Sequence, residues 1–316
     1  MDSTFAGLLL KVVLPLALLI GAGGIWARFG KGIAADQLRA EIGRMVVNLF
    51  APALLFAVTA TTPIDRRLLM VPVIVGGTTL GAGGLLYVLF FHSPLGRKLS
   101  DRTRATLLLC GMFGNVLFMG LPLLGFVFGQ AGERYPVFAD VLATTPLVWT
   151  LGVWVATRLG SHHPEEGKGF WHSLLRLPPV WAFVTGMACN AAGLPVEPLA
   201  RAARFMGQPT IPLMIFVIGL AVPWHDLRPN LPVMVAVAIK LILMPLVALG
   251  TMHAAGYGLS EPGLAAIVET AVPTMVLAIV FADLFHLDTR AAALVMGWST
   301  LLSILTLPAW LFILRI

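Results

Sequence analysis

The run Gly114-Asn115-Val116-Leu117-Phe118-Met119-Gly120-Leu121-Pro122 places two glycines, an asparagine and a proline inside a stretch that is otherwise apolar enough to cross a membrane. Lipid cannot satisfy the backbone groups that such residues free, so a break there must be buried in protein or line a cavity. A shorter interruption, from Val268 to Thr274, recurs in the second half. Two interrupted segments in corresponding halves are typical of a transporter's substrate site.

Composition indicates an integral membrane protein. Of the 316 residues, 58% are hydrophobic and only 11% are charged, which is too few charges to cover a soluble protein of this size. Cys110 and Cys189 stand alone, so we expect neither a disulfide framework nor a metal site. Basic residues cluster in loops, where membrane orientation explains them without a nucleic-acid partner. No P-loop or hydrolase motif is present, so we expect no enzyme and no cofactor.

Windows of about 20 apolar residues predict an all-α fold with ten membrane-spanning helices and short linkers. A polar linker, 161–176, separates a five-helix repeat at 1–160 from a second at 177–316. The ten predicted helices are 6–27, 43–61, 68–91, 104–128, 136–158, 177–194, 208–223, 230–255, 262–284 and 290–314.

An internal comparison supports two inverted repeats. A shift of 160 positions superimposes four identical pairs and places Asn48 opposite Gln208. Because each repeat holds an odd number of helices, the two repeats run in opposite directions, and their breaks should meet at a common axis. We therefore expect Asn115 and Pro273 to lie close together at mid-membrane. The identical pairs are Pro52 and Pro212, Phe56 and Phe216, Pro63 and Pro223, and Pro72 and Pro232.

Lysine and arginine are more numerous in one alternating set of loops, which includes Arg28 to Arg44 and Arg97 to Arg104. These loops should be cytoplasmic, and the linker 161–176 with them. The prediction is a multi-pass protein of the inner or plasma membrane with both termini outside.

These segments resemble the auxin efflux carrier family, which includes plant auxin carriers and bacterial permeases for malonate, malate and similar acids. The run from Asn115 to Pro122 is similar to the Asn-x-x-x-Met-Gly-x-Pro break in the fourth helix of plant carriers, and Val268 to Asp283 to the ninth-helix break. Weaker similarities lie at Asn48 to Phe56 and Ser299 to Pro308. The short linker, where plant carriers often have a long loop, makes the bacterial acid permeases the nearer comparison.

The resemblance implies a scaffold domain of helices 1, 2, 6 and 7, and a transport domain of helices 3–5 and 8–10 in which broken helices 4 and 9 cross. It also implies a homodimer. Pro52 and Phe56 would belong to an apolar wall from the scaffold, and Thr145 lies near the position where plant carriers often have a substrate-binding glutamine.

The residues themselves suggest how a carboxylate could bind. The N-terminal end of each half-helix carries partial positive charge, and Asn115 adds a side-chain donor and acceptor. Gly114 and Gly120 permit close approach, while Pro122 and Pro273 should keep the hydrogen-bond ladder open; Thr274 follows the second break. For each of these residues, an ordinary helix kink is the alternative explanation.

Lys240 lies deep within the eighth predicted helix, where a charge is costly and needs a partner. Glu269, one helix later, is the obvious candidate. A buried ion pair is the slightly favoured interpretation; a counter-charge for substrate or a proton-coupled element are the alternatives. Asn48 and Thr145, with Gln208 and Asp140, could complete a polar lining or simply hold helices together.

The sequence thus predicts a secondary carrier or facilitator of small organic anions that works by alternating access, with an elevator-like movement and possible coupling to H⁺ or Na⁺. A sodium-coupled bile-acid-type symporter is the runner-up. An anion channel is a weaker alternative because it would need a continuous polar pore. A membrane scaffold or sensor is not distinguished by motifs.

Overall fold

The computed structural model describes residues 14–63, 66–159, 177–256 and 259–316. Within these ranges the chain is helical apart from turns and one isolated backbone bridge. The predicted linker 161–176 lies outside the described residues. Six helices are long and apolar enough to cross a membrane, as expected for an integral membrane protein: Ala35–Thr61, Met70–His92, Gln130–Leu159, Glu197–Ala221, Leu231–Ala254 and Thr289–Leu314.

The helices follow one another with short connections, and several contain a wide π-helical stretch or a 3₁₀ turn. In order they are α2 (Leu14–Phe29), α3 (Ala35–Met45), η2 (Val46–Phe50), α4 (Ala51–Thr61), α5 (Met70–Tyr87), η3 (Val88–His92), η4 (Pro94–Gly96), α6 (Asp101–Met112), α7 (Val116–Phe128), η5 (Gln130–Glu133), α8 (Arg134–Ala139), η6 (Asp140–Thr144), α9 (Thr145–Leu147), η7 (Val148–Gly152), α10 (Val153–Leu159), α12 (Pro178–Ala191), α13 (Glu197–Gly207), α14 (Thr210–Ala221), α15 (Leu231–Ala238), η8 (Ile239–Leu243), α16 (Met244–Ala254), α17 (Glu261–Ala271), α18 (Leu277–Leu284) and α19 (Thr289–Leu314).

Three interior prolines leave their helices continuous. Pro52, Pro146 and Pro245 are each the second residue after a π-helical stretch, namely η2, η6 and η8. A proline has no N–H to donate and its ring crowds the carbonyl four residues earlier, and a widened turn relieves both problems. For Pro245 the carbonyl concerned is that of Leu241, which instead accepts a hydrogen bond of 2.9 Å from the indole of Trp310 in α19.

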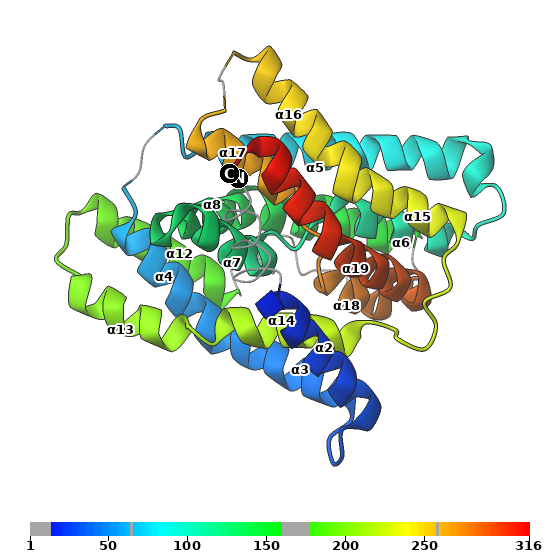
Figure 1. Ribbon diagram of the computed structural model, residues 1–316, viewed down its shortest axis with the longest axis horizontal. Helices are drawn as coiled ribbons and strands as arrows, with labels where there is room; N and C mark the ends of the chain where they lie inside the picture. The colour runs from blue at the N-terminus through cyan, green and yellow to red at the C-terminus, as the bar shows by residue number, and fades with distance from the viewer. Residues whose placement is uncertain (1–13, 64–65, 160–176, 257–258) are drawn as a thin grey trace.

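One group of helices, α2, α3, α4, α12, α13 and α14, packs together on one side of the molecule (Figure 1). Glycines allow these helices to approach closely. A Cβ atom at Gly23 in α2 would meet the backbone of α14, and one at Gly207 in α13 would lie 2.6 Å from the Cβ atom of Leu54 in α4. Such contacts between small residues are the usual basis of helix packing in lipid.

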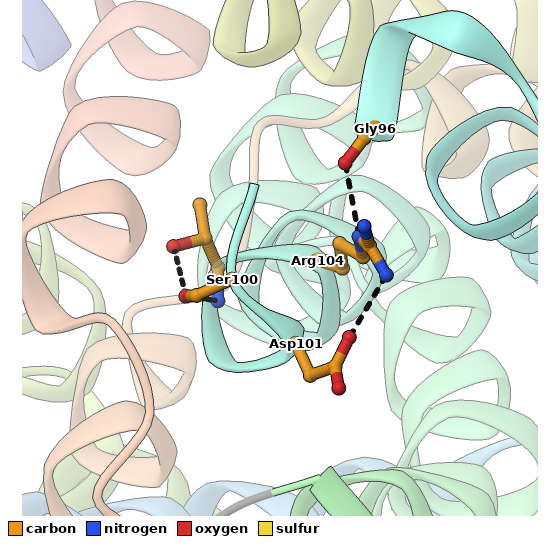
Figure 2. Close-up of polar contacts among 5 residues, drawn as sticks. Gly96, Ser100, Asp101 and Arg104 are labelled. Carbon is orange, nitrogen blue, oxygen red and sulfur yellow. Dashed lines mark hydrogen bonds and ion pairs between the residues drawn. The ribbon is translucent and has the colours of Figure 1, made fainter. Parts of the chain in front are cut away.

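The second group comprises α5, α6 and α15 to α19, with α7 lying between the two groups and contacting both α14 and α17. Polar contacts fix the start of α6 in this group. Ser100 caps the helix, and Arg104 bonds both to Asp101 at 2.9 Å and to the carbonyl of Gly96 at 3.0 Å (Figure 2). Thr103 donates to Asp288, the residue that caps α19, at 2.8 Å. The beginnings of α6 and α19 are thereby held together.

Candidate functional site: the crossing of two broken helices

The two predicted breaks meet in space. The first lies between α6 and α7, at Phe113 to Asn115, and the second between α17 and α18, at Val272 to Val276. Gly114 and Thr274 form an antiparallel bridge. The amide of Asn115 donates to the carbonyl of Pro273 at 2.7 Å, and the amide of Met275 donates to the carbonyl of Phe113 at 3.3 Å. The expected proximity of Asn115 and Pro273 is confirmed.

Gly114 and Thr274, the residues paired in this bridge, are 160 positions apart, which is the offset of the internal sequence comparison. Adding 160 to Asn115 gives Met275, and subtracting it from Pro273 gives Phe113, so the shift converts one bond into the other. A local pseudo-two-fold axis therefore passes through the bridge. Such pairing satisfies backbone groups that both breaks would otherwise leave exposed.

The role expected of Pro122 is wrong. Pro122 lies inside α7, seven residues beyond the break at Asn115, and the helix continues through it to Phe128. The break is instead caused by the Phe113-Gly114-Asn115 segment, in which Asn115 has φ −81° and ψ 58° and precedes the first residue of α7. Pro273, by contrast, lies within its break, as predicted.

Two carbonyl groups freed at the ends of α6 and α17 are capped in different ways. The carbonyl of Cys110 accepts a hydrogen bond of 2.7 Å from the hydroxyl of Thr274. The carbonyl of Thr270, which is related to that of Cys110 by the same offset of 160, accepts a bond of 3.0 Å from the ammonium group of Lys240. A hydroxyl group therefore caps the end of α6, and the ammonium group of a lysine caps the corresponding position at the end of α17.

Gly114 leaves space for the ammonium group of Lys240. A Cβ atom at position 114 would lie 2.7 Å from Nζ of Lys240 and 2.9 Å from its Cε atom, closer than real contacts allow. Lys240 itself is 1% exposed and lies in η8, and its ammonium group also contacts the sulfur of Met244 at 3.6 Å. The prediction that an intramembrane lysine faces the protein interior and finds a polar partner is confirmed.

Lys240 and Glu269 interact electrostatically, but they do not form the close ion pair that was the favoured interpretation. Among the described residues, Glu269 forms no ion pair with Lys240 within 4.0 Å, and neither carboxyl oxygen has a hydrogen-bond partner. Glu269 is fully buried, and its carboxyl group packs against Gly120 of α7, where a Cβ atom would overlap it. The sequence could pair the two charges by type, but it could not show that a freed carbonyl lies nearer to the lysine.

Asn115 is 4% exposed, and its side-chain amide nitrogen is buried without a partner among the described residues. A buried unpaired donor is costly and therefore uncommon. On the other side of the bridge, the amide of Thr274 donates to the hydroxyl of Ser299 in α19 at 3.1 Å. Ser299 was noted in sequence only as part of a weak motif, because nothing local indicates that α19 reaches the crossing.

A family model described as "Membrane transport protein" matches residues 8–311. The chain belongs to the auxin efflux carrier family. It is similar to an uncharacterized transporter of Methanothermobacter thermautotrophicus, with 26% identity over 88% of this chain and 90% of the relative. It also resembles an uncharacterized transporter of Methanocaldococcus jannaschii, with 23% identity over 96% of this chain and 98% of the relative. The transporter YfdV of Escherichia coli is 24% identical over 99% of this chain and 98% of the relative.

Membership of this family makes the chain a multi-pass membrane transporter. The more peripheral predicted residues lie as follows. Asn48 is exposed and donates its side-chain amide to the carbonyl of Arg44 in its own helix at 2.8 Å. Pro52 and Phe56 are half-buried in α4. The hydroxyl of Thr145 donates to the carboxylate of Asp140 at 3.0 Å. Of these residues, only Asp140 and Thr145 are seen to bond with one another.

A small apolar cluster connects the crossing to the first group of helices. Val46, Ala51 and Met214 form its buried part, and Phe118 of α7 packs against it three residues after Asn115. The half-helix that begins at the crossing therefore touches η2, α4 and α14. In the described part of the chain, no three His, Cys, Asp or Glu side chains are grouped so that they could hold a metal ion.

Proposed function

We propose that this protein is a secondary transporter of small organic anions, such as carboxylates or dicarboxylates, and that the anion binds at the crossing of the two broken helices. The observation that carries the proposal is the pair of exchanged hydrogen bonds between Asn115 and Pro273 and between Phe113 and Met275. These bonds join two half-helix ends around a buried ammonium group and an unpaired amide.

An anion would find several donors there. The first amides of α7 have no partner within their helix and point toward the crossing from its positive end. The unpaired amide nitrogen of Asn115 precedes them, and Nζ of Lys240 lies 2.7 Å from the point where a Cβ atom of Gly114 would be. Donors that converge on one buried point are the arrangement by which proteins bind carboxylates without a metal ion.

We further propose ten membrane spans arranged as two inverted repeats. The observed helices support this arrangement because α5 and α15 begin at Met70 and Leu231, 161 residues apart, and the bridge joins positions that are 160 apart. The spans would be α2, α3–α4, α5–η3, α6–α7, η5–α10, α12, α13–α14, α15–α16, α17–α18 and α19. We place both termini outside the plasma membrane, from the distribution of basic residues.

The two groups of helices support an elevator-like movement. The first group contains the helices assigned to the scaffold, and the second, with α7 to α10, would carry the bound anion past it. A homodimer held together by the scaffold completes the proposal, and imposed proton and sodium gradients test whether either ion drives transport.

Uptake into proteoliposomes tests this function directly. Purified protein would be reconstituted and supplied with labelled malonate, malate, succinate or acetate, with imposed proton or sodium gradients. Saturable uptake of at least one acid, with exchange against the same unlabelled acid, is expected. Uptake that does not saturate would indicate a channel, and uptake confined to bile-acid-type substrates with sodium would indicate the symporter. Absence of uptake and exchange for every acid would refute the proposal.

A further inference from the structure

The ammonium group of Lys240 caps the carbonyl of Thr270, whereas the corresponding carbonyl of Cys110 is capped by the hydroxyl of Thr274. We propose that this ammonium group is a built-in cation, which occupies the place of a bound monovalent ion, so that anion transport at this site needs no sodium or potassium ion. The proposal rests on the function proposed above, because it concerns the same crossing.

The repeat relation shows what the lysine replaces. Thr274 caps the carbonyl of Cys110, and the position related to Thr274 is Gly114, which has no side chain to cap Thr270 in the same manner. Nζ of Lys240 lies 2.7 Å from the point where a Cβ atom of residue 114 would be. The ammonium group therefore fills the volume of the missing side chain and makes its hydrogen bond.

The surroundings are suited to a cation. The carbonyl of Thr270 belongs to the C-terminal end of α17, where the helix carries partial negative charge. Broken helices in transporters present such carbonyl ends to coupling ions. The helix that carries Lys240 is fixed nearby, because Trp310 bonds to the carbonyl of Leu241, the next residue. A lysine held in this way cannot extend to the membrane surface, as lysines near helix ends do.

No acidic side chain is in direct contact with Lys240 in the described ranges. Glu269 interacts electrostatically with Lys240 but forms no ion pair with it within 4.0 Å, and Asp140 binds Thr145. An anion could therefore approach the ammonium group without displacing a carboxylate that is bonded to it. A site with its own fixed cation gains nothing from binding a second cation beside it, because like charges repel at short distance.

The first experiment distinguishes two roles of Lys240: attracting the anion by its charge, and donating a hydrogen bond to the carbonyl of Thr270. Three variants would be compared: Lys240→Met, the double variant Gly114→Ser/Lys240→Met, and Lys98→Met, which removes an exposed lysine away from the crossing. In the double variant, a serine hydroxyl can cap Thr270 much as Thr274 caps Cys110. Lys240→Met should lower both the thermal midpoint and malonate affinity, the latter by tenfold or more. The double variant should regain thermal stability but not affinity, whereas Lys98→Met should keep both. Wild-type malonate affinity in the double variant would overturn the proposal, because Lys240 would then be a cap only.

The second experiment needs no substrate. Thermal unfolding of the wild type and of Lys240→Ala would be measured in chloride salts of sodium, potassium, methylammonium and tetramethylammonium at equal ionic strength. The wild type should respond equally to all four salts. Lys240→Ala should be stabilised by methylammonium or sodium but not by tetramethylammonium, which has no N–H and is too large. The proposal would be overturned if sodium selectively stabilised the wild type. It would also be overturned if none of the four cations changed the thermal midpoint of Lys240→Ala. Absence of malonate binding alongside the expected cation effect would instead count against malonate-type anions as substrates.

Discussion

Trp310 in α19 donates a hydrogen bond from its indole nitrogen to the carbonyl of Leu241 in η8. This carbonyl lies four residues before Pro245, which has no N–H to offer it. One helix thus repairs the hydrogen bond that a proline removes from another, as lipid requires. The repair also fixes the helix that presents Lys240.

Replacing the indole tests this repair. Trp310→Phe keeps an aromatic ring but leaves the carbonyl of Leu241 buried and unpaired, which should lower the free energy of unfolding by about 1–3 kcal/mol. Trp154→Phe is the matched control, since Trp154 is 58% exposed. Unfolding in detergent, followed by tryptophan-independent circular dichroism, measures both. Equal effects of the two substitutions would show that the bond contributes nothing.

Asn115→Ala should impair binding more than folding. The amide nitrogen of Asn115 has no partner among the described residues, so its removal breaks no observed hydrogen bond. If the amide binds a carboxylate, a loss of about 1.5–3 kcal/mol corresponds to a roughly tenfold to hundredfold weaker affinity. Thermal unfolding and anion binding by the purified variant check the two halves of this prediction. Wild-type affinity would make Asn115 a packing residue.

Gly120→Ala should be strongly destabilising, because the added Cβ atom would overlap the carboxyl group of Glu269. Overpacking of this kind costs about 1–3 kcal/mol. Combining it with Glu269→Ala should recover part of the loss, because the obstructing group is removed. Gly84→Ala in α5 is the control: no atom lies within 4 Å of its Cβ position, so this variant should be unchanged or slightly more stable. Thermal midpoints of five proteins decide the matter: the wild type, Gly120→Ala, Glu269→Ala, the double variant and the Gly84→Ala control. Purely additive losses would refute the contact.

The ion pair between Glu133 in η5 and Arg204 in α13 joins the two groups of helices. If these groups move against each other, the pair must break in each cycle. A partly exposed pair contributes about 0.2–1 kcal/mol, so Glu133→Gln should change the turnover rate by about 1.4-fold to fivefold and leave affinity within twofold. Glu41→Gln, which breaks an exposed pair within α3, should change neither.

A reversible cross-link tests the same contact. The variant Glu133→Cys/Arg204→Cys, once joined by a bis-methanethiosulfonate reagent, would prevent the two segments from separating. Transport should stop on cross-linking and return when a reductant releases the reagent. Full transport by the cross-linked protein would mean that this contact persists throughout the cycle.

The sequence predicted the breaks better than the side chains around them. Glycine, asparagine and proline act through the local backbone, so Gly114, Asn115 and Pro273 mark the breaks without knowledge of the fold. The prediction of a break at Pro122 was wrong because a helix can continue through a proline when its surroundings compensate for the missing hydrogen bond, as they do at Pro245. The contact between Lys240 and Thr270 could not be predicted, since it depends on where one helix end lies relative to another helix.

The interpretation of helix ends shows the same limit. The second and seventh predicted helices, 43–61 and 208–223, begin earlier in the structure, at Ala35 and Glu197. The added turns, α3 and α13, carry charged residues that a hydropathy window excludes. Their backbone is nevertheless helical, because charged residues such as glutamate and arginine favour helix formation as strongly as many apolar ones.

The bridge between Gly114 and Thr274 holds the two breaks together at one point. The ends of four half-helices, α6, α7, α17 and α18, meet there. At its other end, α6 is bonded to the start of α19 through Thr103 and Asp288. A force applied to any one of these helices is transmitted to the others. An anion bound at the bridge would therefore move together with all four half-helices. The sliding interface would then be the apolar contact of Phe118 with Val46, Ala51 and Met214.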